Sequence, residues 1–137
     1  MASREVIVPK NDKLNVSRNF NLPHSPGIRA GDFIFVSGQG PIDPTTDKLS
    51  TGDIQHETRL VLGNIRRILE GCGASMSDVV RCGVFLKDGH DFKAMNEVYA
   101  EMFGGHKPAR TTVVTGFHTD MKVEIDCTAY KPAAKAT

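Results

Sequence analysis

KPARTTVV, residues 107–114, is the stretch around which the fold can be predicted. Pro108 fixes its own φ angle and biases the residue before it toward extended backbone, so a strand is expected to start here. The β-branched residues that follow favour the same structure. Because side chains alternate between the two faces of a strand, Arg110, Thr112 and Val114 are predicted to share one face.

A second strand is predicted at residues 122–130, KVEIDCTAY. Its alternation puts one set of polar side chains on a single face: Lys122, Glu124, Asp126 and Thr128. The connection at 116–121 is short, so the two strands are expected to pair as a hairpin or to lie as near neighbours. Such pairing would bring Arg110 and Glu124 onto one surface of the sheet.

The remaining sequence predicts the element order β-β-β-α-β-α-β-β. The other expected elements are a strand at 4–9, a tight hairpin over 28–38, a helix between Asp53 and Gly71, a strand at 79–88 and a helix at 92–103. Apolar residues at helical spacing are expected to pack inward from the second helix: Phe92, Met95, Val98, Tyr99, Met102 and Phe103.

This order predicts an α+β fold with a mixed sheet and two helices on one of its faces. The uncovered face would carry many apolar and β-branched residues, and we expect it to be buried against other subunits. The length of 137 residues predicts a single domain, with a strand and loop at 1–22 and a frayed tail at 133–137.

Composition argues against several partners. The net charge is +1, and no basic run exceeds two residues, so nucleic acid is not favoured. No signal peptide and no apolar run of membrane-spanning length is recognised. The odd number of cysteines, Cys72, Cys82 and Cys127, fits no zinc spacing and predicts buried or half-buried thiols in a reducing, cytoplasmic compartment.

The sequence contains no nucleophile elbow, phosphate loop, dinucleotide fingerprint or metal-ligand cluster. What remains is Arg110 and Glu124, near hydroxyl side chains. An arginine suits bidentate binding of a carboxylate, and a glutamate can orient or activate a water molecule. From the residues alone, a purely structural Arg–Glu pair is the favoured alternative. The SGQG turn at 37–40 is simplest as a bulge, and Asn96 as a surface residue, although both could line a cleft.

The sequence resembles the RidA family, also called YjgF, of enamine and imine deaminases. The resemblance extends from about Pro23 to Tyr130 and rests on four motifs in order: AGDFIFVSGQ at 30–39, NEVY at 96–99, PARTTV at 108–113 and VEI at 123–125. It implies a chorismate-mutase-like α+β fold. It also implies a homotrimer, whose sheets form a central barrel and whose ligand clefts lie between subunits.

The resemblance further implies hydrolysis of a 2-imino acid, such as 2-iminobutanoate or 2-iminopropanoate, to a 2-keto acid and ammonia without a cofactor or metal. Arg110 would bind the substrate carboxylate, and Glu124 would position water and exchange protons. The residues that would line the cleft are His24, Ser37, Gly38, Asn96, Thr111 and Thr112.

Two positions depart from the pattern of many deaminating members. His24 stands where they have tyrosine, and Thr112 where they have cysteine. Substrate choice therefore stays open, with aminoacrylate and aminomuconate-like enamines as alternatives. Members described as ribonucleases, translation inhibitors, chaperones or ligand sensors keep a different class of function open as well.

Overall fold

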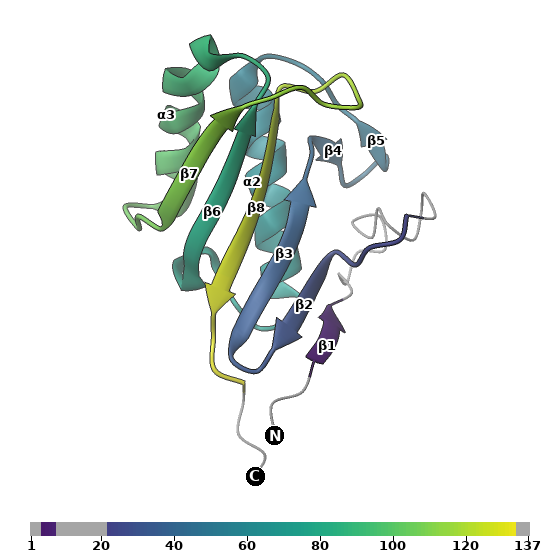
Figure 1. The fold of residues 1–137 in the computed structure, drawn as a ribbon, viewed down its shortest axis with the longest axis vertical. Coiled ribbons are helices and arrows are strands. Elements are labelled where there is room, and N and C mark those ends of the chain that lie inside the picture. Colours follow the sequence, from purple (N-terminus) through teal and green to yellow (C-terminus); the bar gives the residue numbers. More distant parts are fainter. Residues whose placement is uncertain (1–3, 8–21, 134–137) are drawn as a thin grey trace.

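The computed structural model describes residues 4–7 and 22–133 and shows a mixed sheet with helices on one face (Figure 1). Six described strands lie in the order β1-β2-β3-β8-β6-β7. Strands β6 and β7 are parallel, and each other neighbouring pair is antiparallel. Their bounds are β1 Arg4–Ile7, β2 Gly27–Ala30, β3 Phe33–Gln39, β6 Val79–Leu86, β7 Ala109–Val114 and β8 Val123–Tyr130.

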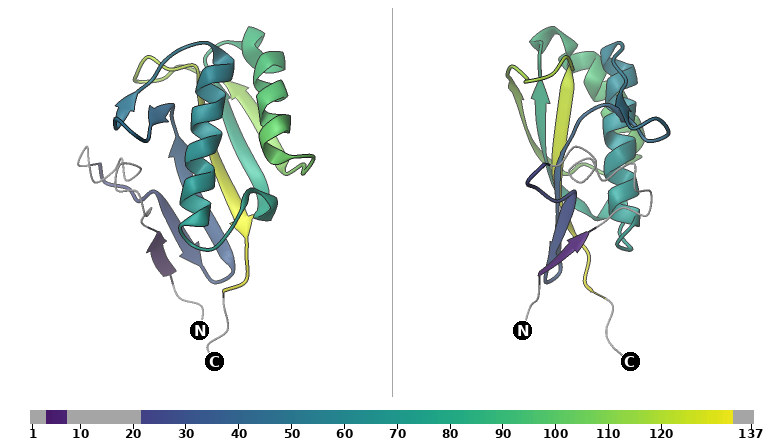
Figure 2. Two further views of the ribbon diagram at one scale, coloured as in Figure 1. Left: turned by 180° about the vertical axis from the view of Figure 1, so that it is seen from behind. Right: turned by 90° about the vertical axis from the view of Figure 1, so that its right-hand side faces the viewer.

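Helices α2 (Ile54–Glu70) and α3 (Phe92–Phe103) both cover the same face of the sheet (Figure 2). The Asp53 carboxylate caps α2 by accepting a hydrogen bond from the His56 N–H at 2.8 Å. Helix α3 ends at Gly104, whose φ of 59° is left-handed. Short elements complete the order: a hairpin of β4 (Ile42–Asp43) and β5 (Lys48–Leu49), and the turns η2 (Met76–Asp78) and η3 (Gly89–Asp91).

The core lies between the helices and the sheet. Its fully buried side chains come from both layers and include Ile34, Val61, Leu62, Ile65, Ile68, Leu69, Val79, Val84, Leu86, Met95, Val123 and Ile125. The predicted α+β fold and the order of its main elements are therefore confirmed. Helical spacing and strand alternation allowed this prediction, because each pattern indicates which face of an element is buried.

The predicted pairing of the strand at 109–114 with the strand at 123–130 is wrong. Strand β6 lies between them, pairing parallel with β7 and antiparallel with β8. A parallel pair needs a crossover connection, and α3 supplies it between β6 and β7. The short connection that leaves β7 passes over the end of β6 to reach β8.

Arg110 and Glu124 consequently do not share a face of the sheet. Arg110 is paired with Cys82 of β6, which is buried under the helices. Glu124 is paired with Phe85, whose side chain lies on the uncovered face. Alternation predicts which residues share a face within one strand. Whether residues of two different strands share a face depends on which strands are neighbours and on their register, and the sequence did not reveal either for β7 and β8.

The uncovered face carries apolar side chains, as predicted. Aromatic and β-branched residues on it remain exposed in the single chain: Val6, Phe33, Phe35, Val113 and Tyr130. The rings of Phe33 and Tyr130 are 5.3 Å apart between centroids, in an edge-on arrangement. The burial of this face against other subunits stays a prediction.

Other expectations have mixed outcomes. Cys82 and Cys127 are buried, Cys72 is half-buried and all three are free, as predicted. Phe92 was expected to pack inward, but 46% of its surface is exposed, since it stands at the first turn of α3. The loop expected at 11–21 and most of the tail at 133–137 lie outside the described residues. Neither α2 nor α3, the long helices that are described, is long and apolar enough to cross a membrane.

One buried carboxylate ties α2 to the start of β8. Glu57 is fully buried, and its carboxylate accepts hydrogen bonds from the backbone N–H of Lys122 at 2.7 Å and of Gly52 at 3.2 Å. The Lys122 ammonium lies 3.3 Å away. A buried charge is tolerated when it is paired and hydrogen-bonded in this way. The contact fixes the backbone two residues before Glu124.

Candidate functional site

The first part of the site surrounds Glu124. Strand β3 has an irregular register between Val36 and Gln39, and this bulge contains Gly38. A Cβ atom on Gly38 would lie 2.9 Å from the Glu124 carboxyl carbon. The Ser37 hydroxyl donates to the Ser25 carbonyl oxygen at 2.6 Å, which ties the bulge to the segment that precedes β2. Gly38 therefore presents backbone without a side chain to the Glu124 carboxylate.

The surroundings of Glu124 make it harder to ionise. Burial raises the pKa of Glu124, and the nearby Asp126 carboxylate raises it further. His118 and His24 act in the opposite direction, since a positive imidazolium favours the carboxylate. A carboxyl group with a raised pKa can exchange protons closer to neutral pH than an exposed glutamate can.

The second part of the site surrounds Arg110. Its guanidinium carbon lies 4.8 Å from the ring centroid of Tyr99 and 5.6 Å from that of Phe92, within cation–π range. Within residues 4–7 and 22–133, no hydrogen bond or ion pair holds the guanidinium. Arg110 thus keeps its donors available for an anion.

Two buried polar atoms near Arg110 lack a hydrogen-bond partner among the described residues, Asn96 Oδ1 and Thr112 Oγ1, whereas the Tyr99 hydroxyl interacts with the Cys82 thiol. Thr112 lies on the same face of β7 as Arg110. Asn96 lies four residues after Phe92 and three residues before Tyr99, so the three side chains lie on one side of α3. Buried polar atoms without partners are rare in folded proteins, and a bound ligand or a neighbouring chain can supply the missing partner.

The predicted site residues therefore form two groups. Glu124, Gly38, Ser37 and His24 belong to the first, and Arg110, Asn96 and Thr112 to the second. Thr111 belongs to neither, because its side chain lies on the uncovered face, where Arg81 donates to it at 3.4 Å.

Sequence reasoning missed three neighbours of these groups: His118, Phe92 and Tyr99. The last two were assigned only to the core, because helical spacing does not reveal which ring meets an arginine from another element. No sequence signal identified His118, which comes from the connection between β7 and β8.

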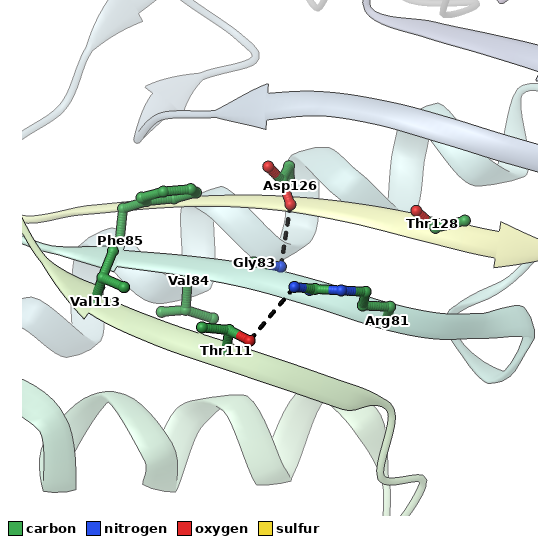
Figure 3. A pocket seen from close by; sticks show the side chains of 8 residues that line it. All are labelled: Arg81, Gly83, Val84, Phe85, Thr111, Val113, Asp126 and Thr128. Atoms are coloured by element: carbon green, nitrogen blue, oxygen red, sulfur yellow. Dashed lines mark hydrogen bonds between the residues drawn. The ribbon is translucent and has the colours of Figure 1, made fainter.

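A separate hollow of about 280 Å³ lies on the uncovered face (Figure 3). Arg81 and Asp126 supply its charges, and the Asp126 carboxylate accepts a hydrogen bond from the Gly83 N–H at 3.0 Å. The hollow contains neither Arg110 nor Glu124. Among the described residues, no cluster of histidine, cysteine and carboxylate side chains could hold a metal ion.

Gly38→Ala should move the Glu124 carboxyl group. The new methyl group would collide with that carboxylate at 2.9 Å and push it toward solvent, so the raised pKa of Glu124 should return toward the ordinary value of 4.5. Titration of the Glu124 carboxyl by ¹³C NMR measures this. Gly116→Ala is the control, since a methyl group there meets nothing within 4 Å. An unchanged Glu124 pKa in Gly38→Ala would show that the bulge does not confine the carboxylate.

Known proteins resemble the chain over most of its length. The family model described as endoribonuclease L-PSP matches residues 18–131. A RutC family protein from Pyrococcus horikoshii is 52% identical over 110 residues, which cover 80% of this chain and 87% of that protein. The 3-aminoacrylate deaminase RutC of Acinetobacter baylyi is 35% identical over 128 residues, covering 93% and 98% of the two chains.

Solved structures agree with this result. The crystal structure of E. coli TdcF with bound serine superposes with a TM-score of 0.75 at 34% identity, over 80% of this chain and 88% of that one. The matched region includes every described strand and helix except β1. By sequence and by fold, the chain belongs to the RidA (YjgF) family, whose model carries the description endoribonuclease L-PSP.

Proposed function

We propose that the protein is an enamine/imine deaminase that hydrolyses 2-imino acids to 2-keto acids and ammonia. The observation that carries this proposal is the Arg110 guanidinium, stacked on two rings and free of any anion within the described residues. Such a group suits a substrate carboxylate. The relative named 3-aminoacrylate deaminase supports this reaction class.

In the proposed reaction, Arg110 holds the carboxylate and Glu124 acts on water. The substrate reacts as its protonated iminium form. Glu124 accepts a proton from water as the water oxygen bonds to the iminium carbon and the C=N π electrons move to nitrogen, which gives a neutral carbinolamine. Glu124 then returns this proton to the nitrogen, the C–N bond breaks with its electrons on nitrogen, and the hydroxyl group gives up its proton to the Glu124 carboxylate, so that a keto group and ammonia form. The raised pKa of Glu124 suits both directions of this transfer.

The two groups of residues can meet only across a boundary between chains. Arg110 faces the helices at the outer strand β7, whereas Glu124 lies on the opposite face of the same sheet. One small substrate cannot contact both side chains through a sheet. We therefore propose that Arg110, Asn96 and Thr112 of one chain face Glu124, Gly38 and His24 of its neighbour.

A homotrimer is the expected assembly. The exposed rings of Phe33, Phe35 and Tyr130 would be buried against neighbouring sheets, which lowers the free energy of association. Sedimentation equilibrium should give a mass three times the 14.9 kDa of one chain at micromolar concentration. Phe35→Lys should weaken the trimer, because it would place a charge in the buried face. A wild-type monomer under these conditions would remove the proposed cleft.

Ammonia release tests the proposed function directly. A pyridoxal-phosphate-dependent dehydratase can supply 2-iminobutanoate or 2-iminopropanoate in situ, and aminoacrylate gives a third arm. The protein should speed ammonia release from at least one of them above the spontaneous rate. The same nuclease-free preparation should not cleave RNA. RNA cleavage without faster ammonia release would favour the ribonuclease alternative.

A further inference from the structure

Two aromatic side chains outside the predicted site contact the Arg110 guanidinium. Only 8% of the surface of Tyr99 is exposed, so its ring is held in a fixed position against the guanidinium. Phe92 is 46% exposed and lies against the same guanidinium from the first turn of α3. The Tyr99 ring therefore belongs to the core, whereas the Phe92 ring lies partly exposed at the surface.

The core itself holds the Tyr99 ring. The Phe103 ring, one helical turn further along, lies 4.6 Å from the Tyr99 ring between centroids, and Phe103 is also buried. The position of the Tyr99 ring against Arg110 therefore does not depend on a bound ligand. Burial raises the pKa of the Tyr99 hydroxyl, so the ring stays neutral.

Stacking of this kind restricts an arginine without using its donors. A guanidinium that lies on an aromatic face keeps the N–H groups at its edge free to bind a carboxylate in a fork. An arginine that is not restrained loses side-chain entropy when it binds, and a pre-positioned one loses less. An ion pair within the chain would also restrain Arg110, but it would occupy the donors.

We propose that Phe92 and Tyr99 are positioning residues that hold the Arg110 guanidinium flat, with its N–H edge open to a carboxylate ligand. This inference rests on the proposed function for the identity of the ligand. It explains the affinity for a carboxylate by the stacked geometry of Arg110 as well as by its charge. It also gives a reason for the exposure of Phe92, a large apolar ring left half open beside a cation.

The affinity of 2-ketobutyrate, the product expected from 2-iminobutanoate, tests the proposal by calorimetry. Phe92→Leu keeps an apolar side chain at an exposed position, so the fold should survive. It should weaken binding by about 3- to 30-fold, as expected for the loss of a cation–π contact. Phe92→Trp should restore the affinity, because indole offers the best face for a cation.

Variants at Tyr99 separate the ring from the hydroxyl. Tyr99→Phe keeps the ring under the guanidinium and removes only the hydroxyl, so it should weaken binding less than Tyr99→Leu does. Tyr99→Leu should weaken binding at least as much as Phe92→Leu. In the Arg110→Ala background, Phe92→Leu should have no further effect, since the rings act only through the arginine.

A measurement without ligand checks the geometry. In the wild type, the Nε–H signal of Arg110, assigned by its loss in Arg110→Lys, should show a ring-current shift that Phe92→Leu reduces. Equal 2-ketobutyrate affinity in wild type, Phe92→Leu and Tyr99→Leu would overturn the proposal, as would a wild type that binds no 2-keto acid. The predicted affinity pattern without any release of ammonia would instead contradict the deaminase function and leave the positioning role intact.

Discussion

Arg110→Ala should abolish deamination while the fold persists. The loss of a charge-assisted contact to a carboxylate in a closed site costs roughly 2–5 kcal/mol, or about 30- to 5,000-fold in affinity. The side chain makes no hydrogen bond or ion pair within the described residues, so its removal leaves no partner unpaired. The far-UV circular dichroism spectrum should therefore match the wild type. Calorimetry with 2-ketobutyrate and the rate of ammonia release measure the two effects.

Arg110→Lys separates charge from shape. Lysine keeps the positive charge but cannot offer two parallel N–H donors, and it stacks less well on Phe92 and Tyr99. Its activity should stay much closer to that of alanine than to that of the wild type. Near-normal turnover of Arg110→Ala would remove Arg110 from the site, whatever the behaviour of the lysine variant.

Glu124→Gln should slow turnover far more than it weakens binding. Glutamine keeps the size of the side chain and can accept a hydrogen bond, but it cannot take up and return a proton. Loss of general acid–base catalysis typically costs about 10²–10⁴ in rate. The variant retains Arg110, the proposed carboxylate-binding residue, so the affinity for 2-ketobutyrate should survive. Single-turnover ammonia release and calorimetry distinguish the two quantities.

The pH profile provides a second test of Glu124. In the proposed reaction the ionised carboxylate accepts a proton from water, and the pKa of Glu124 is raised by burial and by Asp126. Activity should therefore fall as the pH drops through this raised pKa, which lies above the ordinary glutamate value of 4.5. This acid limb should vanish in Glu124→Gln. Weaker binding with an unchanged rate per bound substrate would mean that Glu124 is only a structural partner.

Within each element, the sequence was informative about burial. The alternation that places Glu124 and Asp126 on one face of β8 is observed, and so is the helix that begins after Asp53. The bulge around Gly38 was also predicted, since a glycine inside a strand indicates an irregular register.

Between elements, the sequence was less informative. The crossover that inserts β6 between β7 and β8 depends on how α3 packs, and no local pattern encodes it. Arg110 and Glu124 were therefore assigned to one surface, although they lie on opposite faces. The rings around Arg110 were missed for the same reason, because the contact joins α3 to β7.

The central claim is that each site combines Arg110 of one chain with Glu124 of another, and mixed trimers test it most directly. Co-expression of Arg110→Ala with Glu124→Gln, each inactive alone, should regenerate intact sites wherever a chain with Arg110 meets a chain with Glu124. In a random cyclic trimer about a quarter of the sites are intact, so about a quarter of the wild-type ammonia release should return. A mixture as inactive as its two parents would contradict the shared site.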